Sequence, residues 1–170
     1  MKYILLISLT FMFCPFIEAQ ELKCNCCTET HNQFNFWIGD WEAFNPDGSL
    51  AGTNYIEKIQ GNCVLKENWT SSKGTYTGTS YNYYNYKEKL WEQIWVDNGG
   101  QSLHLKGSFK DGAMILSSEE TTNLQGEKIV NRITWTDNKD GTVRQHWEVL
   151  QVSKNTWSTA FDGLYKKVKK

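Results

Sequence analysis

The sequence predicts an all-β domain, an antiparallel up-and-down barrel of about 8–10 strands with a short N-terminal helix closing one end. Turn-forming stretches such as Asn45-Pro46-Asp47-Gly48 recur every eight to fifteen residues. Asp-Gly and Asn-Gly pairs supply the positive φ that tight hairpins need. The runs between the turns are rich in Val, Ile, Thr and aromatic residues, and neither proline interrupts one, which is typical of strands.

The distribution of tryptophan favours a barrel. The 8 tryptophans are spread over many of these runs and are not clustered in one, which indicates a closed structure lined with large rings. Closing the sheet removes its unpaired edges. A sandwich is the alternative, but it needs longer crossover connections than most of these segments allow.

Each element can be placed in order. A short helical piece is predicted over 28–36, with Thr28 as its cap, and Phe34, Phe36 and Trp37 would cover one end of the barrel. Ten strands are then expected at 41–45, 52–59, 64–71, 76–84, 90–96, 102–109, 113–118, 128–136, 142–150 and 157–165.

The N-terminus predicts export. Residues 1–19 have a positive start at Lys2, an apolar stretch too short to span a bilayer, and a small residue, Ala19, at the cleavage point, as in a secretory signal peptide. A Cys-rich segment would then occupy 20–33, the barrel 34–166 and a basic tail 167–170. We expect a periplasmic or extracellular protein with no integral membrane segment after cleavage. The balance of 18 basic and 19 acidic residues gives no reason to expect a nucleic-acid partner.

Four cysteines would remain after cleavage: Cys24, Cys26, Cys27 and Cys63. An even number in an oxidising compartment predicts disulfides. Cys63 stands alone and needs a partner from the N-terminal group; either Cys27 or Cys26 could serve, and we place the bond at Cys27–Cys63. A soft-metal site formed with His31 is the alternative. The spacing lacks paired Cys-x-x-Cys motifs, so we expect no metal.

Several motifs resemble a known family. Phe34-Asn35-Phe36-Trp37-Ile38-Gly39-Asp40-Trp41 resembles the FDFWIGEW opening of the bacterial DUF1579 family, a domain of unknown function with lipocalin-like character. Similar stretches are 68–70, 132–136, 140–148 and 161–165, so the resemblance covers about 31–165. It implies a calycin-type barrel and no known reaction. Asn35 departs from the family pattern, in which an aspartate is usual.

Alternation along the strands assigns side chains to the barrel interior. Glu67, Gln93 and Gln145 each share a face with apolar residues, so we expect all three to point inward. Desolvation would raise the pKa of an inward Glu67, which makes it the candidate acid or base. An internal ion pair or a position at the barrel mouth is the alternative. The aromatic residues on these faces complete the predicted ligand site: Trp69, Trp91, Trp95, Trp135 and Trp147.

Other polar residues fit structural roles better. Arg132 shares the outer face of its strand and could pair with Glu148 across a hairpin; a buried Arg132 that holds a ligand carboxylate is the alternative. His104 and His146 fall on outer faces, which does not suit a haem ligand, and we expect no cofactor. The sequence has no nucleophile elbow, phosphate loop or zinc-protease motif.

Three functions remain open. A binding protein that holds a small apolar or aromatic molecule in an aromatic-lined interior is the first. An isomerase, cyclase or lyase that uses Glu67 as its base is the second. A structural envelope protein with a filled barrel is the third. We expect binding rather than catalysis, and the sequence predicts neither the ligand nor the oligomeric state.

Overall fold

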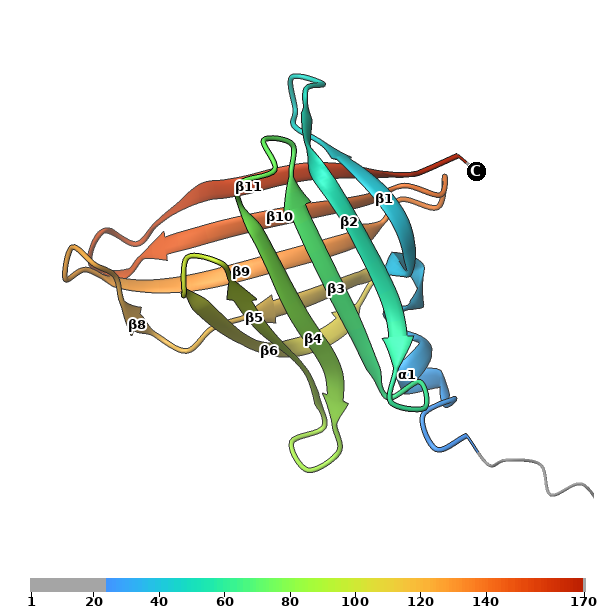
Figure 1. The fold of residues 1–170 in the computed structure, drawn as a ribbon. Helices are drawn as coiled ribbons and strands as arrows, with labels where there is room; N and C mark the ends of the chain where they lie inside the picture. Colours follow the sequence, from blue (N-terminus) through green and yellow to red (C-terminus); the bar gives the residue numbers. More distant parts are fainter. Residues whose placement is uncertain (1–23, 170) are drawn as a thin grey trace, which may run out of the picture.

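Ten strands pair in chain order into a closed barrel within residues 24–169, the part of the chain that the computed structural model describes (Figure 1). Each strand is antiparallel to its neighbours, and β11 returns to pair with β1. The barrel strands are β1 Gly39–Phe44, β2 Leu50–Ile59, β3 Val64–Ser71, β4 Thr77–Asn85, β5 Leu90–Asp97, β6 Ser102–Lys110, β7 Ala113–Ser117, β9 Lys128–Asp137, β10 Val143–Gln151 and β11 Thr156–Lys167.

This topology confirms the predicted up-and-down barrel, and each of the ten predicted strands is present with small differences at its ends. The strand β8 (Thr121–Thr122) was not predicted; it pairs only with β9 in the described chain. A short 3-10 helix, η2 (Val152–Lys154), connects β10 to β11. Each barrel strand pairs with the next barrel strand along the chain, so short connections are enough to produce this strand order.

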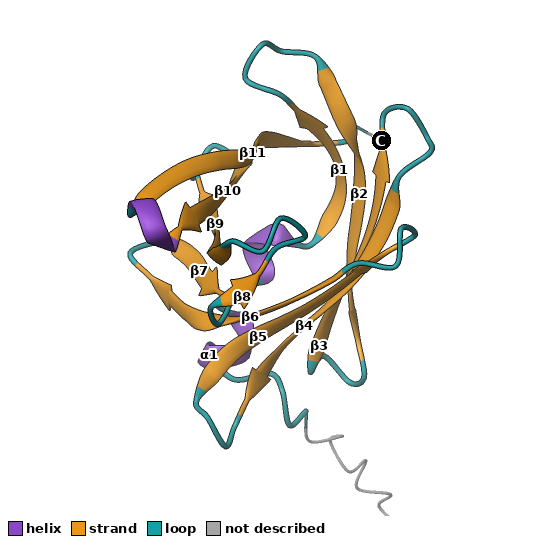
Figure 2. Cartoon of the chain, turned by 90° about the vertical axis from the view of Figure 1, so that its left-hand side faces the viewer, coloured by secondary structure: helices purple, strands orange, loops and turns teal. Residues whose placement is uncertain are grey.

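The helical piece predicted over 28–36 is two short turns, α1 (Glu29–Asn32) and the 3-10 helix η1 (Asn35–Trp37). Thr28 caps α1, as predicted, because its side chain accepts a hydrogen bond from the backbone N–H of His31 at 3.4 Å. Figure 2 shows η1 inside the outline of the ring of strands. The predicted single helix is therefore interrupted at Gln33 and Phe34, which cap the two turns.

Phe34 and Trp37 are the centre of this plug, and both are fully buried. Their rings stack with centroids 5.0 Å apart, and Phe34 also meets the edges of Trp91 at 5.9 Å and Trp135 at 5.3 Å. Such ring pairs add stability beyond the area they bury. The plug residues, as predicted, close one end of the barrel.

Gly39 and Trp41 connect the plug to the wall. Gly39 has a φ of 138°, a backbone conformation that favours glycine, and the chain turns there into β1. Trp41 is 1 % exposed and donates its indole N–H to the carbonyl of Trp37 at 2.8 Å. The first strand is thereby held against the plug.

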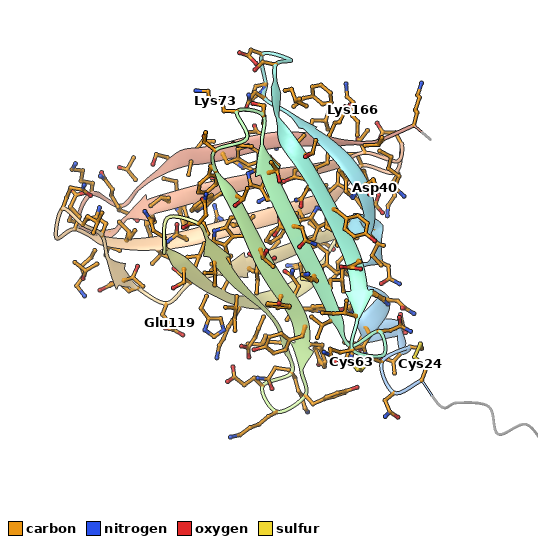
Figure 3. All side chains as sticks on the ribbon, in the orientation of Figure 1. Cys24, Asp40, Cys63, Lys73, Glu119 and Lys166 are labelled. Carbon is orange, nitrogen blue, oxygen red and sulfur yellow. A yellow bond between two sulfur atoms is a disulfide. The ribbon has the colours of Figure 1, made fainter. Side chains whose placement is uncertain are left out.

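Two disulfides hold the N-terminal segment: Cys24–Cys27 and Cys26–Cys63. The predicted bond between Cys27 and Cys63 is wrong, because Cys26 is the buried cysteine and lies next to Cys63, whereas Cys27 is exposed and pairs with Cys24. The segment carrying Cys24 lies beside the hairpin of Cys63 at the plugged end (Figure 3). Disulfides are typical of oxidising, exported environments.

The remaining organisational predictions concern the two ends of the chain. The predicted signal peptide, 1–19, lies outside the described residues. Lys167, predicted to begin the basic tail, is the last residue of β11, and its ammonium lies 5.3 Å from the ring centre of Trp41. Within 24–169, no helix has the length and apolar character needed to cross a membrane.

Candidate functional site

The barrel contains an internal cavity of about 290 Å³ at the end opposite the plug. That volume is close to the lower limit of ~300 Å³ for small-molecule sites. Tyr76, which is 41 % exposed, lies at the rim. Strands from opposite sides of the barrel supply the lining: Glu67, Trp69, Ser71, Tyr76, Gln93, Trp95, Leu103, Ile133, Gln145, Trp147, Ala160, Phe161 and Tyr165.

Glu67 is the only carboxyl group among these lining residues, and it is buried, as predicted, on the inner face of β3. Its Oε1 accepts a hydrogen bond from the Asn54 side-chain amide at 2.7 Å, and its Oε2 accepts one from the Ser80 hydroxyl at 2.6 Å. These partners come from the strands on either side, because Glu67 pairs with Ser80 on β4 and lies diagonally from Asn54 on β2. The sheet therefore positions the carboxyl group.

The hydrogen-bond network continues beyond the carboxyl group. The Ser80 hydroxyl accepts hydrogen bonds from the amides of Asn82 at 2.9 Å and Gln93 at 3.3 Å. Asn82 also donates to the backbone carbonyl of Leu65 at 3.2 Å. Each of these hydrogen bonds restrains the side chains that it joins. Gln93 thus links the carboxyl group to the lining of the cavity.

The charge on Glu67 is disfavoured by its surroundings. Burial raises its pKa from 4.5 to about 7, and the hydrogen bonds from Ser80 and Asn54 oppose only part of that effect. The described lining residues include no Lys, Arg or His that could pair with it. Across the barrel, burial and the neighbouring Glu67 raise the pKa of Tyr165 well above its ordinary value. Glu67 is thus poised to change charge near neutral pH.

Tyr165 and Gln145 meet on the opposite wall. The Tyr165 hydroxyl donates to Gln145 Oε1 at 2.5 Å, from neighbouring strands β11 and β10. Tyr165 is 1 % exposed, so this bond satisfies a buried hydroxyl. The inward position predicted for Gln145 is correct, and its side-chain carbonyl is engaged by tyrosine.

Glycines on adjacent strands make room for the large rings of the wall. A β carbon at Gly78 would lie 2.1 Å from the indole of Trp95, and one at Gly52 would lie 2.7 Å from the indole of Trp69. Both rings therefore lie against bare backbone. The aromatic wall depends on glycine at these positions, where any larger residue would displace a ring.

A β-bulge in β11 shapes the remaining wall. The pairing of β10 with β11 shifts between Trp147, which pairs with Phe161, and Glu148, which pairs with Thr159, so Ala160 is left over. Bulges re-aim side chains and are frequent beside functional sites. Here Ala160 and Phe161 both reach the cavity although they are adjacent in sequence. Phe161 meets the ring of Trp69 edge-on at 6.1 Å.

The cavity brings together most of the predicted ligand site. Glu67, Trp69, Gln93, Trp95, Gln145 and Trp147 line it, whereas Trp91 and Trp135 do not. The latter two point inward as predicted, but they pack against the plug at the closed end. The other lining residues were not predicted: Ser71, Tyr76, Leu103, Ile133, Ala160, Phe161 and Tyr165.

A second buried carboxylate, Glu92, alternates with the inward-pointing Gln93 and so lies on the outer face of β5. It is only 3 % exposed because outer-face neighbours cover it. It accepts hydrogen bonds from Asn85 at 2.6 Å and Tyr83 at 3.0 Å, and lies 2.8 Å from His104 Nε2. Burial alone would raise its pKa, but these hydrogen bonds and the charge of Lys106 outweigh burial and lower it. Glu92 is thus a stabilised outer-face carboxylate, separate from the cavity.

Arg132 has the structural role predicted for it. Its guanidinium donates to Glu148 at 2.9 Å and 3.2 Å and lies 4.0 Å from the ring centre of Trp157 on the outer surface. His104 is exposed, as expected, and His146 lies 3.1 Å from the Thr159 hydroxyl, outside the cavity.

The cysteines of the alternative soft-metal site are not free to bind a metal. All four cysteines of the described chain are paired in disulfides, so they cannot act as thiolate ligands. His31 is buried, and its Nδ1 lies 2.7 Å from the Thr28 hydroxyl. Burial, with a contribution from the charge of Lys58, lowers the pKa of His31. The histidine therefore belongs to the packing of the N-terminal segment.

Comparisons with known proteins give no independent guide to function. No protein-family model matches the chain, and a search of the curated proteins found no match. The chemistry of the cavity therefore carries the functional argument.

Proposed function

We propose that this protein is a lipocalin-like binding barrel that holds a small molecule with an apolar or aromatic body in the cavity above Glu67. The observation that carries the proposal is a cavity of about 290 Å³ whose walls are aromatic and whose polar groups are few and fixed. Such a composition provides affinity through ring packing and selectivity through a small number of hydrogen bonds. A wholly filled barrel, as a purely structural role would predict, does not account for this space.

Ligand binding can be measured through the tryptophans of the wall. We expect a panel of small aromatic and apolar compounds to change the tryptophan fluorescence, and native mass spectrometry to show one molecule bound per chain. Trp95→Leu should weaken binding because Trp95 lines the cavity. Trp157→Leu is the matched control, since Trp157 is 37 % exposed and stacks on Arg132 outside. Equal losses from the two variants, or no binding across the panel, would contradict the proposal.

Catalysis by Glu67 is a second candidate function. The supporting observation is a buried carboxyl group that reaches the cavity with a pKa of about 7. A general base is most efficient when its pKa lies near the working pH. An isomerase, cyclase or lyase would use it to move a proton on a bound substrate. Loss of turnover in Glu67→Gln, with ligand binding retained, supports this candidate; unchanged turnover excludes it.

Export to a periplasm or to the outside of the cell is proposed from the sequence of residues 1–19, and the two disulfides support it. Cellular fractionation, with amino-terminal sequencing of the mature chain, tests this proposal.

Membership of the DUF1579 family is likewise proposed from the 34–41 motif and the later stretches quoted above. Both proposals are independent of the cavity.

A further inference from the structure

We infer that the cavity selects organic cations: small amines whose ammonium group lies against Glu67 and whose apolar body fills the aromatic space toward the mouth. The inference rests on the proposed binding function and specifies its ligand class. It is carried by three features of the described residues, namely the uncompensated carboxyl group, the acceptor sites it has left, and the rings around it.

The first feature is the sign of the charge inside the cavity. Glu67 is 4 % exposed, and the described cavity-lining residues include no cationic side chain. The groups that face it are Asn54 from β2, Ser80 from β4 and Tyr165 from β11, all uncharged, with Tyr76 farther away at the rim. A buried carboxylate normally has a cationic partner. A cationic ligand would supply that partner, whereas an anionic ligand would be repelled.

The second feature is the hydrogen-bonding capacity of the carboxylate. An ionised carboxylate offers about four acceptor sites. Each oxygen of Glu67 accepts one hydrogen bond from the side chains described above. Acceptor capacity is therefore left on a group that lines the cavity. An ammonium group has only donors, which matches this set of acceptors.

The third feature is the ring system beside Glu67. Trp69 lies two residues along the same strand, and its ring centre is 6.1 Å from that of Phe161 and 6.4 Å from that of Tyr165. The faces of Trp and Tyr rings attract cations, most strongly where water is excluded. The rings and the carboxylate together form an aromatic site with one negative group, which suits an alkylammonium.

The position of the other lining residues fixes the orientation of the ligand. Trp95, Leu103 and Trp147 provide apolar surface, and the exposed Tyr76 marks the rim. The ammonium group should therefore lie deep, and the apolar part should lie toward the opening. This arrangement suits an arylalkylamine better than a long fatty chain, because the cavity measures only about 290 Å³.

The test uses three compounds of similar size and different charge: 2-phenylethylamine, 2-phenylethanol and 3-phenylpropionate. Isothermal titration at pH 8 should show the amine binding at least tenfold more tightly than the alcohol, with the carboxylate weakest. Raising the pH from 5.5 to 8 should tighten amine binding about tenfold or more as Glu67 ionises, because an alkylamine titrates only near 10. The affinity of the alcohol should not rise over this range.

Proton release provides a direct readout on the unmodified protein. At pH 6 the amine should displace a proton from Glu67, so the heat of binding should depend on the ionisation enthalpy of the buffer. Binding of the neutral alcohol should release none. This measurement does not depend on the folding of any variant.

Two buried glutamates provide a matched pair of variants. Glu67→Gln should remove the preference for the amine and its pH dependence, while leaving the alcohol bound. Glu92→Gln, which changes a carboxylate on the outer face, should leave the preference intact. Equal affinity for amine and alcohol with a flat pH profile overturns the cation inference but leaves the binding function standing. If neutral members of the wider panel bind and no amine does, the preference for cations is wrong and the binding function stands. If nothing in that panel binds, both the preference for cations and the binding function are wrong.

Discussion

The indole of Trp95 occupies the space that a side chain at Gly78 would fill, with 2.1 Å between the ring and a β carbon placed there. The two residues lie on paired strands, β5 and β4. The wall of the cavity is therefore built from a large ring and a missing side chain together. A related contact occurs between Trp69 and Gly52 on β3 and β2, where the backbone carbonyl of Thr70 is closer still, at 2.4 Å from the added β carbon. Changing the small partner should be as harmful as changing the large one.

Gly78→Ala should weaken ligand binding and destabilise the barrel by about 1–3 kcal/mol, the usual cost of overpacking. The added methyl must displace the Trp95 indole into the cavity or away from the wall. Chemical denaturation and ligand titration measure the two effects. Combining Gly78→Ala with Trp95→Leu should cost less than the sum of the single changes, because the smaller side chain relieves the clash. Additive costs would show that the two residues do not compete for space.

Folding stability should depend on pH through Glu67. Its pKa rises from 4.5 to about 7 on folding, so the folded state binds more protons between these values. The stability associated with Glu67 is therefore fully present below pH 4.5 and is lost as pH rises through about 7. The limit of this loss is about 3 kcal/mol, at 1.36 kcal/mol per unit.

Urea denaturation of the wild type and Glu67→Gln at several pH values isolates this contribution. The variant should gain stability relative to the wild type as pH increases from 5 to 8, because its amide does not ionise. Glu92→Gln should not reproduce this trend, since the pKa of Glu92 is lowered. A constant difference between wild type and Glu67→Gln across this range would rule out the raised pKa.

The Tyr165–Gln145 hydrogen bond predicts a compensating pair of changes. Gln145→Leu should cost about 1–3 kcal/mol because it removes the acceptor to which the buried Tyr165 hydroxyl donates. Adding Tyr165→Phe should recover much of that loss, since both polar groups are then removed. Thermal unfolding of the single and double variants measures the coupling between the residues. A double variant no more stable than Gln145→Leu would argue against this bond as the cause.

The two disulfides should differ in their contribution to stability. Cys26–Cys63 closes a loop across a separation of 37 residues, whereas Cys24–Cys27 spans only 3. Chain entropy predicts about 4 kcal/mol for the first and roughly half of that for the second. Paired Cys-to-Ser variants of each bond, compared by denaturation, test the difference. Equal losses would show that strain or residual denatured structure, and not loop length, sets their contributions.

The sequence was informative about which face of each strand points inward, because alternation follows directly from backbone geometry. It placed Glu67, Gln93 and Gln145 correctly in the interior. Alternation carries no information about depth along the barrel axis. For that reason Trp91 and Trp135 were grouped with the ligand site, although they pack against the plug. Depth became clear only from the strand register.

Two further features could not be predicted from the pattern. The bulge at Ala160 interrupts alternation, so Phe161 and Ala160 both reach the cavity. The correct cysteine pairing depends on which of two adjacent residues faces the β2–β3 hairpin, and the spacing of Cys26 and Cys27 does not decide this. Both features depend on a local departure from regular structure, whereas the strands follow from regular patterns of side chains and turns.

The covalent attachment of the plug has a consequence for how a ligand enters and leaves the barrel. The Cys26–Cys63 bond fastens the N-terminal segment to the β2–β3 hairpin at the closed end, and the segment's Phe34 and Trp37 are fully buried there. A ligand would have to enter and leave through the open end of the barrel, near Tyr76. The loops around this open end would then govern the residence time of the ligand. Changes to these loops would alter the rates of ligand association and dissociation without altering the contacts made at Glu67.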